Sequence, residues 1–297
     1  MQFSKKPVGD MVGFELEIYQ FGQGDGPKLM VTGGIHGGEV TGTHAAKKLI
    51  QYLTEHESEL KGQVKVLPIC NQGGFRRMER TNPYDDLDMN RIFPGKLAAS
   101  PTLVTANLIY REAAWPDYIV DLHCCGIYGS NYVLSIWNES EKGKELAGML
   151  DIPVVIQSGG TEGQLFVEAS RKLGKAAVII ELAGGQPNGS VDLAAAEEAY
   201  LALVKLIKQL GMLPGPVEKP KPVFCGKLEG KSSEINGFFL PAVSKGSWIS
   251  KGQRIGQLNE KDVVAEADCR ILRVGPARYL FCGDSLYTFA RKAECSQ

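Results

Sequence analysis

Short apolar runs that alternate with helix-spaced segments constrain the fold of this chain more than any other feature of its sequence. The apolar runs with the length of buried strands lie at 28–34, 63–71, 118–123 and 176–182. The segments with helical spacing of apolar residues lie at 37–56, 101–114 and 191–211. Strands that alternate with helices form a mostly parallel sheet covered by helices on both faces. We therefore predict an α/β fold for the first two-thirds of the chain.

A proline-rich stretch separates this region from a different kind of sequence. Residues 213–222 are rich in proline and lack periodicity, as is typical of a linker. The sequence that follows consists of short strand-like runs broken by Gly, Pro and Asn. We predict an α/β domain over 1–212, a linker over 213–222 and a small all-β domain over 223–297.

Composition excludes several classes of partner. The formal net charge is −1, so no strong field attracts nucleic acid or an anionic membrane. No stretch of about 18 apolar residues is present to cross a bilayer. The first residues lack the apolar stretch of a signal peptide, and the seven cysteines form no C-x-x-C motif. We expect a cytoplasmic protein with free thiols.

The stretch TGGIHGGEVTG, residues 32–42, places His36 and Glu39 in a glycine-rich turn between a strand and a helix. The carboxyl ends of strands in an open α/β sheet form the usual ligand-binding edge. Imidazole and carboxylate are suitable zinc donors, although two more ligands are needed for a tetrahedral site. The alternative is a surface His and a Glu whose negative charge interacts favourably with the dipole at the N-terminus of the helix. We expect the glycines to leave room for a ligand.

Two further side chains follow buried strands. His123 ends the strand-like run YIVDLH, and Asp121 precedes it by two residues on the same face, where it can hold the imidazole. Glu181 ends the run AAVIIE and precedes two glycines. A carboxylate beside a buried strand is costly unless it is paired or functional, so Glu181 is either a general base or the partner of a Lys or Arg.

Residues 71–95 have no clean periodicity and predict a long loop. The loop carries arginines, which bind carboxylates through two hydrogen bonds and stabilise oxyanions. The alternative is an ordinary solvated, charged loop.

Four segments in order, GGIHGGE, RTNPYDDLDMNRIFPG, DLH and IIELAGG, resemble the succinylglutamate desuccinylase/aspartoacylase family, relatives of the zinc carboxypeptidases. The resemblance covers most of residues 25–190. It implies a zinc-carboxypeptidase-like sheet flanked by helices. The segment GFFLPAVSKGSWISKGQRIGQL resembles the barrel-sandwich domain appended in this family, without the Met-Lys-Met type signal for biotin or lipoyl.

The resemblance also implies roles for individual residues. His36, Glu39 and His123 would bind one zinc ion per chain, and Glu181 would act as the general base. Asn90 and Arg91 would bind a substrate carboxylate. Arg80 would polarise the scissile carbonyl, with Arg76 and Arg77 as alternatives. Three ligands and a water complete a catalytic zinc site, so Cys124 and Cys125 are left out.

The function that follows is zinc-dependent hydrolysis of the amide bond of a small N-acyl amino acid or related amide. The alternatives are a zinc metallopeptidase of carboxypeptidase type, an esterase with the same zinc site, and a non-catalytic ligand-binding module. The expected partner is a small amide that carries a carboxylate. The sequence leaves open the acyl group, the amine, homo-oligomer formation and which side chains of the β domain reach the site.

Overall fold

A ten-stranded sheet forms the centre of the molecule in the computed structural model, which describes residues 1–9 and 14–293. Its strands are β1 (Gln2–Pro7), β2 (Glu15–Phe21), β3 (Lys28–Gly33), β4 (Gln63–Leu67), β5 (Tyr118–Gly126), β6 (Tyr132–Ser135), β7 (Val154–Gln157), β8 (Ala176–Gly185), β9 (Ser190–Val191) and β10 (Val223–Lys227). The order is β1-β2-β4-β3-β5-β8-β6-β7-β10, with β9 paired to β8. The pairs β4-β3-β5-β8 at its centre are parallel, as the alternating pattern predicts.

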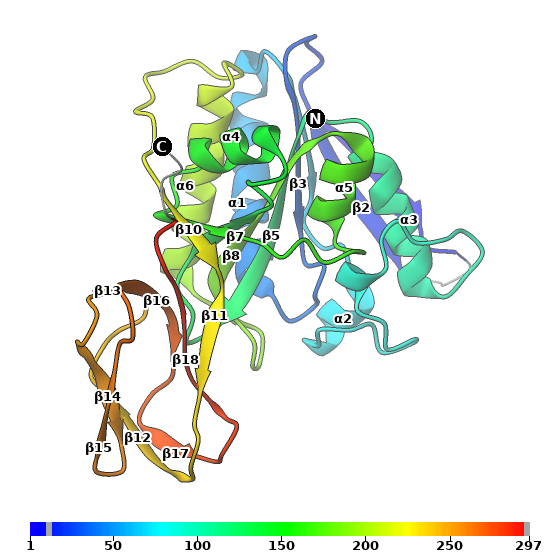
Figure 1. Cartoon of the computed structure of the whole chain (residues 1–297). Helices are drawn as coiled ribbons and strands as arrows, with labels where there is room; N and C mark the ends of the chain where they lie inside the picture. The colour runs from blue at the N-terminus through cyan, green and yellow to red at the C-terminus, as the bar shows by residue number, and fades with distance from the viewer. Residues whose placement is uncertain (10–13, 294–297) are drawn as a thin grey trace.

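Helices cover both faces of this sheet (Figure 1). The helices are α1 (Val40–His56), α2 (Gln72–Arg77), α3 (Pro101–Ala113), α4 (Glu141–Met149), α5 (Leu165–Leu173) and α6 (Leu193–Gln209). Helices α1, α4 and α6 pack on one face, while α3 and α5 pack on the other. None of the helices in the described ranges is long and apolar enough to cross a membrane.

The predicted loop 71–95 contains local structure that its sequence did not indicate. Asn71 caps α2 by accepting a hydrogen bond from the backbone of Gly74, and Met89–Arg91 form a short 3₁₀ helix. Two glycines in α2 obscure its helical character because glycine has a poor helix propensity. Close contacts explain them: a Cβ on Gly73 would lie 2.6 Å from Asn82, and one on Gly74 would lie 2.7 Å from a backbone oxygen.

The region after the proline-rich segment is all β. Its strands are β11 (Glu229–Ser232), β12 (Gly237–Pro241), β13 (Trp248–Ile249), β14 (Arg254–Leu258), β15 (Lys261–Val264), β16 (Cys269–Val274), β17 (Arg278–Leu280) and β18 (Ser285–Ala290). They form two four-stranded antiparallel sheets, ordered β11-β18-β16-β13 and β15-β14-β12-β17. Strand β10 pairs with β7 in the large sheet, so the small sheets begin at β11. Residues 294–297 of the predicted β domain, with Cys295, lie outside the described residues.

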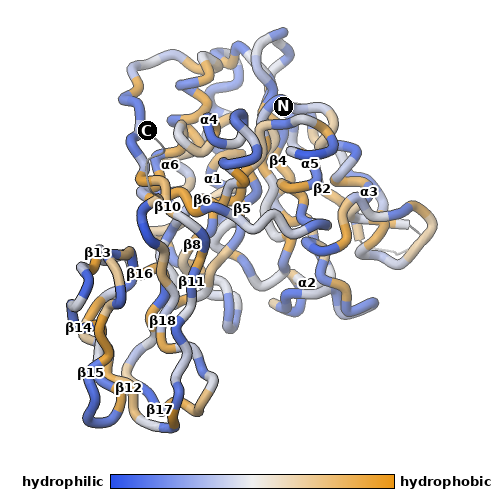
Figure 2. Tube along the Cα trace, in the orientation of Figure 1, coloured by the Kyte–Doolittle hydropathy of each residue, from blue (hydrophilic) through white to orange (hydrophobic). Residues whose placement is uncertain are grey.

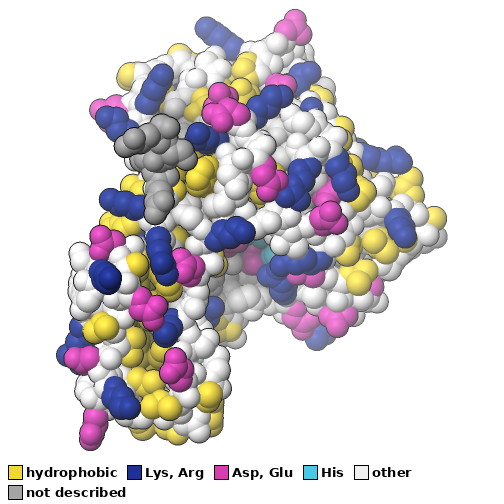
Figure 3. Space-filling view, in the orientation of Figure 1, with side chains coloured by type: hydrophobic (Ala, Val, Ile, Leu, Met, Phe, Trp, Pro, Cys, Tyr) yellow, Lys and Arg dark blue, Asp and Glu magenta, His cyan; other side chains and the backbone are white. Residues whose placement is uncertain are grey.

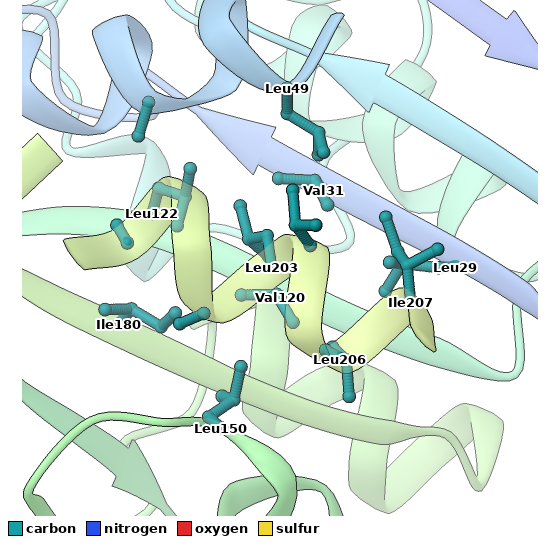
Figure 4. Close-up of a cluster of buried hydrophobic side chains, with 14 of the residues drawn as sticks. Leu29, Val31, Leu49, Val120, Leu122, Leu150, Ile180, Leu203, Leu206 and Ile207 are labelled. Atoms are coloured by element: carbon teal, nitrogen blue, oxygen red, sulfur yellow. The ribbon is translucent and has the colours of Figure 1, made fainter. Parts of the chain in front are cut away.

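Figure 2 shows hydrophobic residues along the central strands. These strands bury apolar side chains on both faces, which explains the continuous hydrophobic runs of their sequences. Val31, Val120 and Ile180 point to the face of α1 and α6, whereas Met30 and Ile119 point to the opposite face. Leu203 and Leu206 of α6 belong to the same buried cluster as Val31, Val120 and Ile180 (Figure 4). Burial of one such side chain contributes about 1.5–3 kcal/mol, so this core stabilises the strands that carry the site.

Candidate metal centre and active site

Three adjacent parallel strands, β3, β5 and β8, bring four of the predicted site residues to one edge of the sheet. His36 and Glu39 lie in the turn between β3 and α1, and His123 lies near the carboxyl end of β5. Glu181 of β8 is in register with His123. Parallel strands carry their carboxyl ends to the same edge, and this explains why residues far apart in the sequence meet.

His36, Glu39 and His123 are buried and lie close enough together to hold one metal ion. Nδ1 of His36 lies 2.9 Å from Oε1 of Glu39, and Nδ1 of His123 lies 2.9 Å from Oε2. The two Nδ1 atoms are 3.1 Å apart. Tetrahedral donors about 2.0–2.1 Å from one zinc ion would lie about 3.3 Å from each other. The spacing of the three donors fits such an ion.

Carboxylates occupy the outer nitrogen of each imidazole. Nε2 of His36 lies 3.0 Å from Asp88, and Nε2 of His123 lies 2.9 Å from Asp121, which also accepts a 2.7 Å hydrogen bond from Thr32. These contacts place the proton of a neutral imidazole on Nε2 and leave the Nδ1 lone pair for a metal. The predicted contact of Asp121 is confirmed. Asp88 escaped prediction because it comes from a loop whose path the sequence does not fix.

The electrostatics of this cluster favour a positive charge at its centre. Burial lowers the pKa of His36, but the carboxylates of Glu39 and Asp88 outweigh burial and raise it. Burial likewise opposes protonation of His123, yet Asp121 and Glu39 raise its pKa well above the ordinary value. Against its own burial, the two imidazoles hold the pKa of Glu39 well below its usual range. Either protons on the imidazoles or a bound cation can balance the negative charge of these carboxylates, and the three donors fit a divalent metal.

The glycines beside His36 serve close packing of the protein rather than the approach of a ligand. A Cβ on Gly37 would lie 1.8 Å from the carbonyl carbon of Gly74, and one on Gly38 would lie 1.8 Å from the Gln186 amide. Both glycines therefore let the turn pack directly against its neighbours. The expectation of a turn left open for a ligand is wrong at these two positions.

A cavity of about 480 Å³ opens beside the cluster. Its residues in the first two-thirds of the chain include Glu39, Arg80, Tyr132 and Glu181. Figure 3 shows His colour at the bottom of the hollow between the β region and the rest of the molecule, with Lys and Arg around it. Burial raises the pKa of Glu181 to about 7, and the charge of Glu39 adds to this effect, while His123 opposes it. A carboxyl group with this pKa can exchange protons near neutral pH.

Arg80 is the arginine of the predicted loop that reaches this cavity. Its Nε donates a 2.9 Å hydrogen bond to Asp88, and its Nη1 lies 3.6 Å from Glu39. Arg76 instead lies over the ring of Phe14 at 4.8 Å. Asp88 thus connects Arg80 to the imidazole of His36 through its two carboxylate oxygens.

Asn90 and Arg91 lie elsewhere on the same loop. Asn90 is buried, and its side-chain oxygen accepts a 3.0 Å hydrogen bond from the backbone of Leu165 at the start of α5. Arg91 is exposed and donates to the Asn90 carbonyl at 2.7 Å. Neither residue is among those that line the cavity beside Glu181.

The two neighbouring cysteines remain protonated. Burial raises the pKa of Cys124 to about 12, helped by the charge of Glu39, and burial raises that of Cys125 well above its ordinary value. A thiolate is the form that binds metal, so these thiols are poor ligands. The backbone of Cys124 contributes instead, by donating a 3.0 Å hydrogen bond to Glu39. All six cysteines in the described part of the chain are free.

Comparison with known proteins identifies similar chains. The model of the succinylglutamate desuccinylase/aspartoacylase catalytic domain matches residues 25–207. The N-alpha-acetyl-L-2,4-diaminobutyric acid deacetylase of Halomonas elongata is 27% identical over 268 residues, which cover 85% of this chain and 77% of the relative.

Solved structures share the fold. A succinylglutamate desuccinylase/aspartoacylase from Rhodobacter sphaeroides superposes with a TM-score of 0.81 at 18% identity, covering 98% of this chain and 95% of the other. The product-bound ectoine utilization protein EutE (DoeB) from Ruegeria pomeroyi superposes with a TM-score of 0.78 at 21% identity, covering 94% of this chain and 89% of the other.

Proposed function

This chain belongs to the succinylglutamate desuccinylase/aspartoacylase family, and we propose that it is a zinc-dependent hydrolase of the amide bond in a small N-acyl amino acid. The observation that carries the proposal is the convergence of two imidazole Nδ1 atoms and one carboxylate beside a cavity that also contains Glu181 and Arg80. The deacetylase from Halomonas elongata supports the reaction class. His36, Glu39 and His123 are the proposed zinc ligands.

Zinc bound there would lower the pKa of a water molecule to about 7 and polarise the amide carbonyl. Glu181 is the proposed general base. Its carboxylate accepts the proton of the attacking water and afterwards passes it to the leaving amine. Arg80 is held by Asp88 with its guanidinium beside Glu39, and it stabilises the negative charge that develops on the carbonyl oxygen.

The β region supports a small substrate over a long peptide. Leu228, Leu272, Arg273 and Thr288 line the cavity together with residues of the large sheet and its loops, so the β region limits the space for a substrate. We assign residues 1–212 to catalysis and, within the predicted β domain 223–297, the part that follows β10 to this covering role. Asn90 and Arg91, which do not line the cavity beside Glu181, keep their proposed part in binding a substrate carboxylate at a position separate from that cavity. The hydrogen bond that the Asn90 side chain accepts from the backbone of Leu165, at the start of α5, holds this residue in place.

Metal analysis and a substrate panel test the proposal. The purified protein is expected to hold one zinc ion per chain. Zinc-loaded protein is then assayed with N-acetyl and N-succinyl amino acids, including N-acetyl-L-2,4-diaminobutyrate, alongside dipeptides and simple esters. Faster hydrolysis of an N-acyl amino acid than of any dipeptide or ester supports the deacylase. Preference for a peptide would favour a metallopeptidase, and absence of both zinc and turnover would favour a binding module.

A further inference from the structure

The cavity contains a second arginine, Arg273, which comes from strand β16 of the appended β region. Arg80, the other arginine that lines the cavity, is already engaged with Asp88 and Glu39. Within residues 1–9 and 14–293, Arg273 forms no ion pair and its side chain donates no hydrogen bond to the protein. Its guanidinium group therefore has its full set of donors available inside a substrate-sized cavity.

A β-bulge aims this side chain at the cavity. The pairing of β16 with β18 shifts register between Ile271 and Arg273. Ile271 and Val274 both face the core of the β region, although strict alternation would place them on opposite faces. Leu272 is buried in a separate cluster that contains Tyr132, and Arg273 is exposed beside Thr288, which also lines the cavity. Bulges re-aim side chains in this way beside active sites.

The backbone around Arg273 is fixed to the segment that follows β5. The backbone of Ser130 donates a 2.8 Å hydrogen bond to Leu272, and Val274 donates a 3.3 Å hydrogen bond to Tyr128. Gly129 and Arg273 form a bridge between these two contacts. Because His123 lies on β5, the same segment ties Arg273 to the metal-ligand cluster, and its position relative to the site is set by backbone contacts.

We propose that Arg273 binds a carboxylate on the amine half of the substrate. Glu181 and Tyr132 are paired in register on neighbouring strands, and Leu272 next to Arg273 belongs to the same buried cluster as Tyr132, which places Arg273 on the Glu181 side of the cavity. The assignment to the amine half rests on the proposed function, in which Glu181 protonates the leaving amine. Guanidinium binds carboxylate through two charge-assisted hydrogen bonds. Arg273 is thus a substrate-binding residue that the sequence motifs do not include.

A binding experiment tests this without requiring turnover. Glu181→Gln protein, loaded with zinc, is titrated with N-acetyl-L-alanine and with its neutral analogue N-acetyl-L-alaninamide, and binding is followed by ligand-observed NMR. The free acid is expected to bind more tightly than the amide by about 10- to 100-fold. Adding Arg273→Ala is expected to remove this preference, while Arg273→Lys keeps part of it because the charge is retained.

Arg254→Ala supplies the matched control, because Arg254 lies in the same β region but pairs with Asp262 away from the cavity. This control is expected to keep the full preference for the free acid. The inference is overturned if the Glu181→Gln protein shows no preference for the free acid, or if the preference persists in Arg273→Ala. In the otherwise unmodified enzyme, Arg273→Ala is expected to raise KM for the free acid more than it lowers kcat. Failure of the proposed function would appear separately, as absence of zinc or hydrolysis in the unmodified protein.

Discussion

The Nδ1 atoms of His36 and His123 face each other across 3.1 Å. With both Nε2 atoms held by carboxylates, neutral imidazoles direct two lone pairs toward one point, beside a third acceptor on Glu39. Three acceptors this close repel one another unless a cation lies between them. The affinity for metal is therefore expected to depend on Asp88 and Asp121, the carboxylates that contact the two Nε2 atoms.

Replacement of Asp121 by Asn is expected to weaken zinc binding by about 10- to 100-fold, because the amide cannot supply the negative charge behind His123. Competition with a chelator of known affinity measures the change. Asp86→Asn serves as the control, since Asp86 bonds Thr81 and lies outside the cluster. Unchanged affinity in Asp121→Asn would mean that the carboxylate does not support the metal site.

Zinc affinity is expected to increase with pH. Burial lowers the pKa values of His36 and His123, but the neighbouring carboxylates outweigh burial and raise both. Below these pKa values zinc must displace protons, so binding releases protons and weakens as pH falls. Calorimetry in buffers of different ionisation enthalpy counts the protons released. A count of zero across pH 6–8 would contradict the proposed ligands.

Glu181→Gln is expected to reduce kcat by at least about 10²-fold while zinc remains bound, because the amide cannot accept a proton. The pKa of about 7 comes chiefly from burial, and a bound dication would favour the carboxylate and lower this value. Activity should therefore rise with pH below neutrality and level off once Glu181 is ionised. Near-normal turnover by Glu181→Gln would show that another group is the base.

The sequence predicts this centre because each key residue follows a recognisable strand. Parallel strands end at one edge, so His36, His123 and Glu181 could be placed together from local patterns alone. Asp88 and Arg273 were out of reach for a different reason. The position of Asp88 depends on how a long loop folds back, and that of Arg273 depends on a one-residue bulge and on contacts between distant strands. Such tertiary relationships leave little trace in local periodicity.

A buried ion pair away from the site makes the stability of the fold dependent on pH. Glu112 of α3 bonds Lys65 of β4 and Lys6 of β1, and the two partners Glu112 and Lys65 are 12% and 8% exposed. Burial raises the pKa of Glu112, but the two lysines outweigh burial and lower it. The resulting stabilisation is complete above the ordinary Glu pKa of about 4.3 and is lost as pH falls through the lowered value.

Glu112→Gln is accordingly expected to cost about 2–3 kcal/mol at neutral pH, because Lys65 is left buried without its partner charge. The same variant should lose less stability than the unmodified protein between pH 5 and pH 3. Urea unfolding at several pH values measures both effects. Glu141→Gln, which removes an exposed contact with Lys144, is the control and should change little. If Glu112→Gln and Glu141→Gln lost the same free energy of unfolding between pH 5 and pH 3, this account would be wrong.

Gly37→Ala tests whether the turn that carries His36 depends on close packing. The new Cβ would lie 1.8 Å from the Gly74 carbonyl carbon, and backbone on both sides must shift to relieve the clash. We expect the free energy of unfolding to fall by more than about 2 kcal/mol and the affinity for zinc to decrease. Gly148→Ala in α4 meets nothing within 4 Å and should instead stabilise the fold by about 0.5–1 kcal/mol. Thermal unfolding without zinc measures the change in stability, and the added stabilisation by zinc measures the change in zinc affinity. If Gly37→Ala changes neither quantity, the turn tolerates the methyl group and this prediction is wrong.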